Sequence, residues 1–334
     1  MTPLFEVLRR WPEPFTRPVP GGPWVEEAVL HGVAPWVEES LSAGKQVVPE
    51  RLLAASRSQL SAGNRHRRFT LDVLDALSHQ GVTPVLLKGY GLARRLYSSA
   101  LSRPASDVDV FVMPPQRVAA ELALSSLGLA YQPDAGLADA FEDHHHRAFS
   151  GARGLVELHH RLASGFGGEG FPDSELDSRC ISAELDGRAV RYLAPEDELT
   201  YLAVHAATHS FLRLSWLVDL KRFVALVPLD WELLVSRARR IRLVRPLRVA
   251  LELSQRLLDA PIPPRAQRLL SSFSVRAPLD RVVFSEERVA SGDWAREQVP
   301  AFLLHVYLTQ SPRQMAQHVF AGFKRAIRRA RAGD

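Results

Sequence analysis

R-P-A-S-D-V-D-V-F-V, from Arg103 to Val112, is the most informative segment of this chain. Its last six residues alternate, so that Asp107, Asp109 and Phe111 would face one side of a strand and three valines the other. Two prolines after Met113 end the pattern, because proline cannot donate to a strand ladder. The segment therefore predicts a strand that carries two acids on one face.

Two carboxylates at such spacing lie about 7 Å apart along one face of a strand. Neighbouring carboxylates repel each other and lose hydration when they are buried, and a divalent cation between them offsets both penalties. Mg²⁺ prefers oxygen ligands and leaves positions for substrate phosphates. A D-x-D pattern alone more often marks two solvent-facing aspartates on an edge strand, so the surrounding sequence has to decide between these interpretations.

A short apolar run precedes the acids, at Pro84–Leu87, and predicts a buried strand. It ends in Lys88 and Gly89, and a helical pattern follows from Tyr90 to Ser98. Glycine lets the backbone approach a ligand closely, and the N-terminus of a helix offers free N–H groups to phosphate. This strand-to-helix turn is therefore a candidate phosphate site.

A third acid follows the D-x-D strand in sequence. His146–Ser150 and Leu155–Arg161 flank a four-residue Gly-Ala-Arg-Gly loop and predict a hairpin. Alternation along the second strand places Glu157 and His159 on one face. Glu157 could complete a metal cluster with the two aspartates. The same alternation divides the triplet His144-His145-His146 between two faces, which argues against a compact set of histidine ligands.

The rest of the chain is predicted to be mainly helical. Apolar residues recur at helical spacing over 24–41, 49–80 and 116–127, with a Pro- and Gly-rich extended strap at 11–23 and a further strand at 188–193. From Pro195 onward the patterns are helical only. We expect a helical segment over 1–80, an α/β core over 81–194 and a helical domain with a basic last helix over 195–334.

Composition and charge limit the function classes. Apolar residues make up 46% and charged residues 24% of the 334 residues, as in ordinary globular proteins. The net charge is +5. Four of these five excess charges come from the last eleven residues, which carry Lys324, Arg325, Arg328, Arg329, Arg331 and Asp334. The remaining chain is nearly neutral, so a nucleic acid is not favoured as partner.

The single cysteine, Cys180, excludes a disulfide framework and a Cys-rich zinc module, and it fits a reducing compartment. The N-terminus lacks the apolar core of a signal peptide. Since no window reaches the roughly 18 uninterrupted apolar residues of a membrane helix, no membrane span is expected. These features predict a cytoplasmic location.

Taken together, the motifs resemble the uncharacterised nucleotidyltransferase family of the polymerase-beta-like superfamily. The resemblance rests on L-L-K-G-Y-G-L-A-R-R-L-Y (Leu86–Tyr97), the D-x-D segment, V-E-L-H-H-R-L (Val156–Leu162), L-A-P-E-D-E-L-T-Y-L-A-V-H-A-A-T-H (Leu193–His209) and W-L-V-D-L (Trp216–Leu220). It spans roughly residues 70–240. His160 stands where the family pattern has tryptophan.

The resemblance implies an α+β fold, with a small mixed sheet of the polymerase-beta-like type flanked by N-terminal and C-terminal helices. It implies that Asp107, Asp109 and Glu157 are catalytic and bind Mg²⁺, with two ions expected and Mn²⁺ as an alternative. One ion would activate an acceptor hydroxyl for attack on the α-phosphorus of a nucleoside triphosphate such as ATP. The other would stabilise the leaving pyrophosphate. The acceptor would be a small molecule, sugar, peptide or RNA.

Four residues are candidates for contact with the nucleotide: Lys88, Gly89, Arg103 and Ser106. Arginine suits bidentate contact with phosphate, whereas lysine acts as a point charge. The alternatives are a solvent-exposed lysine at a strand end and an arginine that pairs with a surface acid.

Four further residues are candidates for the acceptor side: His159, His205, His209 and Asp219. His205 and His209 are four apart on one helical face, a spacing that suits a metal ion, packing between helices, or the acceptor pocket that the resemblance suggests. Asp219 could be a base or the ion-pair partner of a packed helix.

Two other functions compete with catalysis. One is a catalytically silent scaffold that binds nucleotide or a partner protein. The other is an RNA-binding protein that acts through the basic, helically patterned tail Phe320–Arg331. Three acids around one predicted site favour the enzyme, and the nearly neutral body disfavours the RNA-binding protein.

Overall fold

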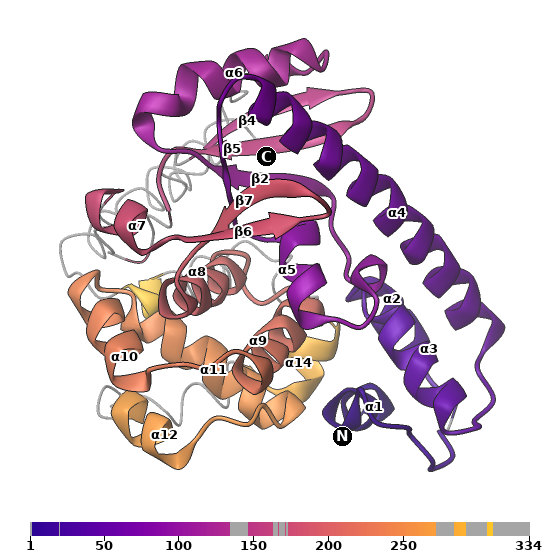
Figure 1. Ribbon diagram of the computed structural model, residues 1–334. Helices are drawn as coiled ribbons and strands as arrows, with labels where there is room; N and C mark the ends of the chain where they lie inside the picture. Colours follow the sequence, from indigo (N-terminus) through magenta and orange to yellow (C-terminus); the bar gives the residue numbers. More distant parts are fainter. Residues whose placement is uncertain are drawn as a thin grey trace, which may run out of the picture.

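A computed structural model describes residues 2–19, 21–133, 146–162, 166, 171, 173–271, 284–291 and 306–309. Within them the chain forms a mixed α+β fold around one seven-stranded sheet (Figure 1). The strands are β1 (Val85–Leu86), β2 (Asp107–Phe111), β3 (Ala130–Gln132), β4 (His146–Gly151), β5 (Gly154–His159), β6 (Ile181–Leu185) and β7 (Arg188–Tyr192). Their order is β3-β4-β5-β2-β1-β7-β6. This confirms the predicted fold class.

Along the chain, helices precede the strands, lie between them and follow them. They are α1 (Pro3–Arg10), α2 (Trp24–Leu30), α3 (Ala34–Ala43), α4 (Glu50–His79), α5 (Gly89–Leu96), α6 (Arg117–Ser126), α7 (Asp173–Arg179), α8 (Pro195–Thr208), α9 (Leu214–Leu226), α10 (Trp231–Arg240), α11 (Val244–Leu258), α12 (Pro264–Ser271) and α14 (Glu286–Ser291), with short 3₁₀ turns at Ala100–Ser102 and Pro114–Gln116. In Figure 1, α6 lies above the sheet, α4 beside it and α8–α11 below it.

Strand β2 is central because it pairs antiparallel with β1 and parallel with β5. The predicted alternation is confirmed. Val108 and Val110 are buried in the apolar cluster under α4 and α6, whereas Phe111 is buried in the cluster on the other side. Each fully buried side chain of this size stabilises the fold by about 1.5–3 kcal/mol. This burial fixes the register, because a slip of one residue would turn the valines outward.

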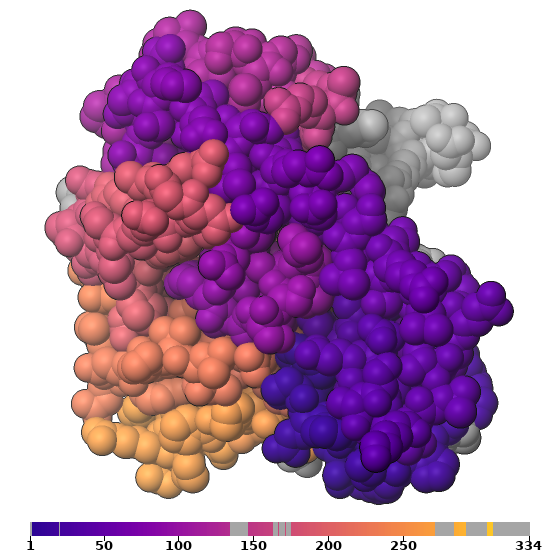
Figure 2. Space-filling model, turned by 45° about the vertical axis from the view of Figure 1, so that its right-hand side comes forward, coloured from indigo at the N-terminus to yellow at the C-terminus, as the bar shows by residue number. Residues whose placement is uncertain are grey.

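The apolar cluster that contains Phe111 also joins the N-terminal helix α1 to helices that follow the sheet in sequence. It combines side chains of α1, such as Leu4 and Phe5, with side chains of α8, α9 and α11. The ammonium of Lys221, on α9, donates to the carbonyls of Leu8, Arg9 and Trp11 at 2.9, 2.7 and 3.2 Å. Figure 2 shows this proximity from outside, with the indigo N-terminal helices against the orange C-terminal ones.

Several local predictions are corrected. The pattern over 24–41 is not one helix, because the chain turns at Gly32, where φ is +67°. The hairpin loop has two residues rather than four, since Gly151 pairs with Gly154. Strands β3 and β6 and helix α7 were not predicted. Beyond residue 195 the described residues contain helices but no strand, as expected.

No helix among the described residues is long and apolar enough to cross a membrane. The basic tail and two members of the histidine triplet, His144 and His145, lie outside the described residues. The predicted division of the chain into segments 1–80, 81–194 and 195–334 stays a proposal. The cluster that holds α1 also includes residues from the other two proposed segments.

Candidate active site

The register of β2 against β5 assembles a group of three acids. Asp109 lies directly opposite Glu157, and Asp107 lies two residues earlier on the same face. One carboxylate oxygen from each of Asp107, Asp109 and Glu157 lies within 4.8 Å of the others. The expected convergence is therefore observed. Oxygen ligands at this spacing fit a hard divalent cation.

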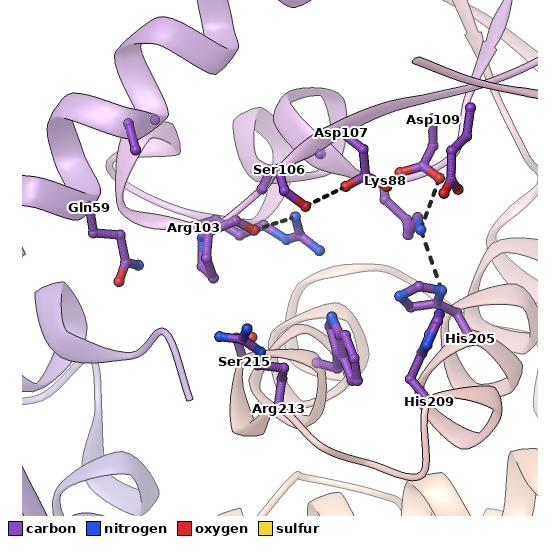
Figure 3. A pocket seen from close by; sticks show the side chains of 17 residues that line it. Gln59, Lys88, Arg103, Ser106, Asp107, Asp109, His205, His209, Arg213 and Ser215 are labelled. Carbon is purple, nitrogen blue, oxygen red and sulfur yellow. Dashed lines mark hydrogen bonds and ion pairs between the residues drawn. The ribbon is translucent and has the colours of Figure 1, made fainter. Parts of the chain in front are cut away.

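Lys88 lies at the end of β1 and holds the acids from one side. Its ammonium is 2.9 Å from Asp109 Oδ1 and donates to His205 Nδ1 at 3.3 Å (Figure 3). Burial would lower the pKa of Lys88, but the attraction of Asp109, Asp107 and Glu157 outweighs it and raises the pKa. A buried, charged lysine thus offsets part of the repulsion among the acids.

Gly89 begins α5 directly beside Lys88, with a φ of +60°. Glycine adopts this left-handed conformation without the penalty that a side chain would bring. A Cβ there would also come within 3.1 Å of His66 Nε2, on α4. The position therefore requires glycine on two grounds. It keeps the backbone at the N-terminus of α5 open toward the acids.

His159 supports the acids from behind. Its Nε2 is 3.1 Å from Asp109 Oδ1 and 3.5 Å from Glu157 Oε2. Burial disfavours the imidazolium, but hydrogen bonds to Asp109 and Glu157 raise the pKa of His159 overall. Burial alone would raise the pKa of Glu157. The hydrogen bond from His159 and the charge of Lys88 outweigh burial and lower this pKa to about 2. Glu157 is therefore charged at neutral pH.

A pocket of about 390 Å³ opens in front of the acids. Figure 3 shows its walls, with Asp107 and Ser106 on one side and Arg213 and Ser215 on the other. Its lining consists of Gln59, Ala62, Gly63, Lys88, Gly89, Arg103, Pro104, Ala105, Ser106, Asp107, Asp109, Glu157, His205, His209, Arg213, Ser215 and Trp216. A volume of this size suits a small-molecule substrate.

Two of the predicted acceptor-side histidines form an aromatic wall of this pocket with Trp216. The rings of His205 and His209 lie 5.1 and 5.4 Å from the indole, measured between centroids. Burial lowers the pKa of His205 well below its ordinary value and that of His209 to about 4. Both imidazoles are therefore neutral at pH 7.

Arg103 and Asp219 bind each other. The guanidinium donates from Nη2 to Asp219 Oδ2 at 2.7 Å and from Nε to Oδ1 at 2.9 Å. Both side chains are at most 5% exposed, and the hydroxyl of Tyr97 also donates to Asp219. Arg103 lines the pocket, whereas Asp219 lies behind it. Ser106, at the rim, donates to Asp107 Oδ1 at 2.9 Å.

Sequence reasoning missed several residues of the site. His146 lies opposite His159 in the β4–β5 pair, and its Nε2 is 3.7 Å from Glu157 Oε1. The hairpin register could have indicated this, because directly opposed residues share a face. Helix packing brings Arg213, Ser215 and Trp216 to the pocket. Only Trp216 lies in a segment that carries the family resemblance, and that segment indicated no role for it in the site.

A mixed sheet presents three converging carboxylates beside a strand-to-helix turn, an arrangement that suits transfer of a phosphorus-containing group. The sequence comparison is more specific, because a model of the uncharacterised nucleotidyltransferases matches residues 24–259. The chain belongs to this family, which confirms the resemblance.

Two solved structures are similar at low identity. The solution structure of the antibiotic-resistance factor ANT(2'')-Ia is 15% identical, with 65% of this chain and 91% of that chain covered and a TM-score of 0.34. The crystal structure of ANT(2'')-Ia in complex with adenylyl-2''-tobramycin is 13% identical, with 69% and 97% covered and a TM-score of 0.29. No curated protein matches significantly.

The buried histidines predict a loss of stability in mild acid. Burial lowers the pKa of both His66 and His209 to about 4. Between pH 6.5 and 4 the unfolded chain binds protons at these residues that the folded chain does not. Stability therefore falls with pH in this window, by up to about 1.4 kcal/mol per residue and pH unit. The raised pKa of His159 does not oppose this, since its contribution is complete below pH 6.5.

Urea unfolding of wild type and His66→Gln between pH 4.5 and 7 measures the effect. The variant should lose less stability on acidification than wild type. His79→Gln, a change of an exposed histidine near the end of the same helix, is the control and should follow wild type. Equal slopes for His66→Gln and wild type would contradict the assignment.

Proposed function

We propose that the protein transfers a nucleoside monophosphate from a nucleoside triphosphate to a hydroxyl of an acceptor, in a Mg²⁺-dependent reaction that releases pyrophosphate. The observation that carries this proposal is the convergence of Asp107, Asp109 and Glu157 at one pocket. These acids come from two adjacent strands of a chain in a nucleotidyltransferase family.

The donor atoms of this group fit Mg²⁺, with Mn²⁺ as an alternative, because all three are carboxylate oxygens. Asp107, Asp109 and Glu157 would hold two ions, which when bound supply charge for the triphosphate and activate the acceptor hydroxyl. Ser106 and His159 position this group by their bonds to Asp107 and Asp109.

Lys88 and Gly89 are assigned to the triphosphate. The ammonium of Lys88 lies at the acids and can exchange Asp109 for a phosphate oxygen when other cations balance the carboxylates. The open backbone at Gly89 adds N–H donors from the first turn of α5. Arg103 lines the same pocket, and its guanidinium is fixed by Asp219. Arg103 would therefore orient the triphosphate, and Asp219 would position Arg103.

The proposed reaction is a single displacement at the α-phosphorus. The acceptor oxygen forms a bond to the α-phosphorus, and the bond from the α-phosphorus to the bridging oxygen breaks. Pyrophosphate leaves with the electron pair, and the hydroxyl proton passes to solvent. His205 and His209, neutral and buried at the pocket wall, would contact the acceptor without adding charge.

One observation favours the alternative of a silent scaffold. The ammonium of Lys88 already balances part of the charge of the acids, so the group persists without a metal ion. A scaffold would bind nucleotide or a partner protein without transfer. Metal binding and turnover distinguish the two proposals.

The test is incubation of the protein with Mg²⁺, each α-labelled nucleoside triphosphate and a panel of hydroxyl acceptors. We expect label transfer and equimolar pyrophosphate from wild type, and neither from Asp107→Ala/Asp109→Ala. Mn²⁺ binding, followed by its paramagnetic effect on water relaxation, should weaken in the same double variant. Label transfer by the double variant would contradict the mechanism. Nucleotide binding without metal binding or transfer would support the scaffold.

A further inference from the structure

The pocket wall across from the acids is formed by the first turn of α9. Arg213 precedes this helix, and Ser215 and Trp216 lie in its first turn. All three line the pocket. Figure 3 shows Arg213 and Ser215 across the pocket from Ser106 and Asp107. The N-terminus of a helix carries partial positive charge, which favours an anion.

Arg213 is a cation with no acidic partner among the described residues, unlike the other two that line this pocket. Lys88 is bound to Asp109, and Arg103 to Asp219. Arg213 donates from Nη1 to the carbonyl of Leu30 at 2.8 Å, which anchors the side chain and leaves its other N–H groups available. The charge is therefore held in place at the pocket.

The side chain of Ser215 also favours a ligand at this wall of the pocket. Its residue is only 3% exposed, yet it lines the pocket, and its hydroxyl makes no hydrogen bond within the described part of the chain. The oxygen itself is open to the pocket, where a ligand or water can bond to it. A hydroxyl directed into a pocket beside a guanidinium is suited to a ligand oxygen.

The acids of the pocket are all on the other wall. Among the lining residues the carboxylates are Asp107, Asp109 and Glu157 only. The triphosphate already has donors beside them, at Lys88 and the start of α5. The wall at Arg213 and Ser215 is thus a separate place for negative charge, on the side where His209 and Trp216 would contact the acceptor.

We propose that the first turn of α9 is an anion subsite for the acceptor, which carries a phosphate or carboxylate group in addition to its hydroxyl. Arg213 and Ser215 bind this group, and Trp216 contacts the carbon skeleton beside it. This inference rests on the proposed transfer to a hydroxyl. It predicts discrimination against polycationic acceptors, because the wall offers them a guanidinium and no carboxylate.

The subsite is tested by calorimetric titration of the full chain in EDTA, with inorganic phosphate, glucose 6-phosphate, glucose and tobramycin as probes. We expect the two anions to bind, and glucose and the polycationic tobramycin to bind at least about tenfold more weakly. Arg213→Gln should weaken anion binding at least about tenfold, and Ser215→Ala by a few-fold. Arg65→Gln, a change of an exposed arginine on α4, is the matched control and should leave binding unchanged.

A second titration separates the acceptor from the triphosphate as the source of the anion. Glucose 6-phosphate should still bind wild type saturated with Mg²⁺ and α,β-methylene-ATP, and Arg213→Gln should bind this nucleotide as wild type does. Competition between the two ligands, with both weakened in Arg213→Gln, would overturn the proposal and assign the wall to the triphosphate. Anion binding that is unaffected by Arg213→Gln, or preferential binding of tobramycin, would also overturn it.

Failure of the anion subsite can be distinguished from failure of the proposed transfer reaction. Asp107→Asn should bind inorganic phosphate as wild type does, since the subsite lies across the pocket. Arg213-dependent binding of anions without any label transfer would remove the transferase proposal and keep the subsite as a ligand site. Label transfer to neutral or cationic acceptors alone would keep the transferase and remove the anionic acceptor.

Discussion

Asp107→Asn should lower the rate of nucleoside monophosphate transfer by at least about 100-fold, because the loss of one metal-binding carboxylate removes several kcal/mol of transition-state stabilisation. The same change should leave the free energy of unfolding within about 1 kcal/mol of wild type. Asp107 is only half-buried, at the first position of β2, and accepts a hydrogen bond from the hydroxyl of Ser106. Initial rates across a range of Mg²⁺ concentrations, with urea unfolding in parallel, measure both effects.

Glu184→Gln provides the matched control. It makes the same chemical change at an exposed residue of β6, away from the pocket. It should be indistinguishable from wild type in rate and in stability. If Asp107→Asn kept more than a tenth of the wild-type rate with an unchanged Mg²⁺ dependence, Asp107 would not belong to the catalytic group.

The largest effect on stability is expected for Asp219→Asn. The variant leaves the guanidinium of Arg103, 5% exposed, without its counter-charge. Removal of one partner of a buried ion pair typically costs about 3–5 kcal/mol. We expect a loss in this range by urea unfolding, with the lower end favoured because asparagine can still accept from Tyr97 and Arg103.

The double variant Arg103→Met/Asp219→Leu separates charge from packing. It removes both charges and fills the space with apolar atoms, so it should recover most of the stability lost in Asp219→Asn. A loss below about 1 kcal/mol in Asp219→Asn would show that the pair does not hold α9 in place. Activity that disappears while stability stays unchanged would instead support Asp219 as a base.

The group of acids could be predicted because its evidence is local. Strand alternation places Asp107 with Asp109, and Glu157 with His159, on one face each, and period two leaves little ambiguity. That the two strands are neighbours came from the family resemblance and not from periodicity. The structure then supplies what no pattern carries, namely the register that sets Glu157 opposite Asp109.

The remaining features depend on contacts between distant segments. Arg213 reaches the pocket because it directly precedes α9, and no local signal distinguishes it from other residues at the start of a helix. Strand β6 was missed because it lies at the sheet edge, where only Leu185 of its five residues is buried. The break at Gly32 was missed because apolar spacing continues across it.

The bond between Lys221 and the end of α1 has a consequence for how the chain reaches its native state. Leu8 and Trp11 leave the ribosome about two hundred residues before the ammonium that their carbonyls accept from. Until α9 has been synthesised, the apolar face of α1 has no partner there, and contacts so distant in sequence form slowly. The N-terminal segment is therefore made first and can pack early against α2 and α3, whereas its contacts with α9 and α11 form only after those helices have been synthesised.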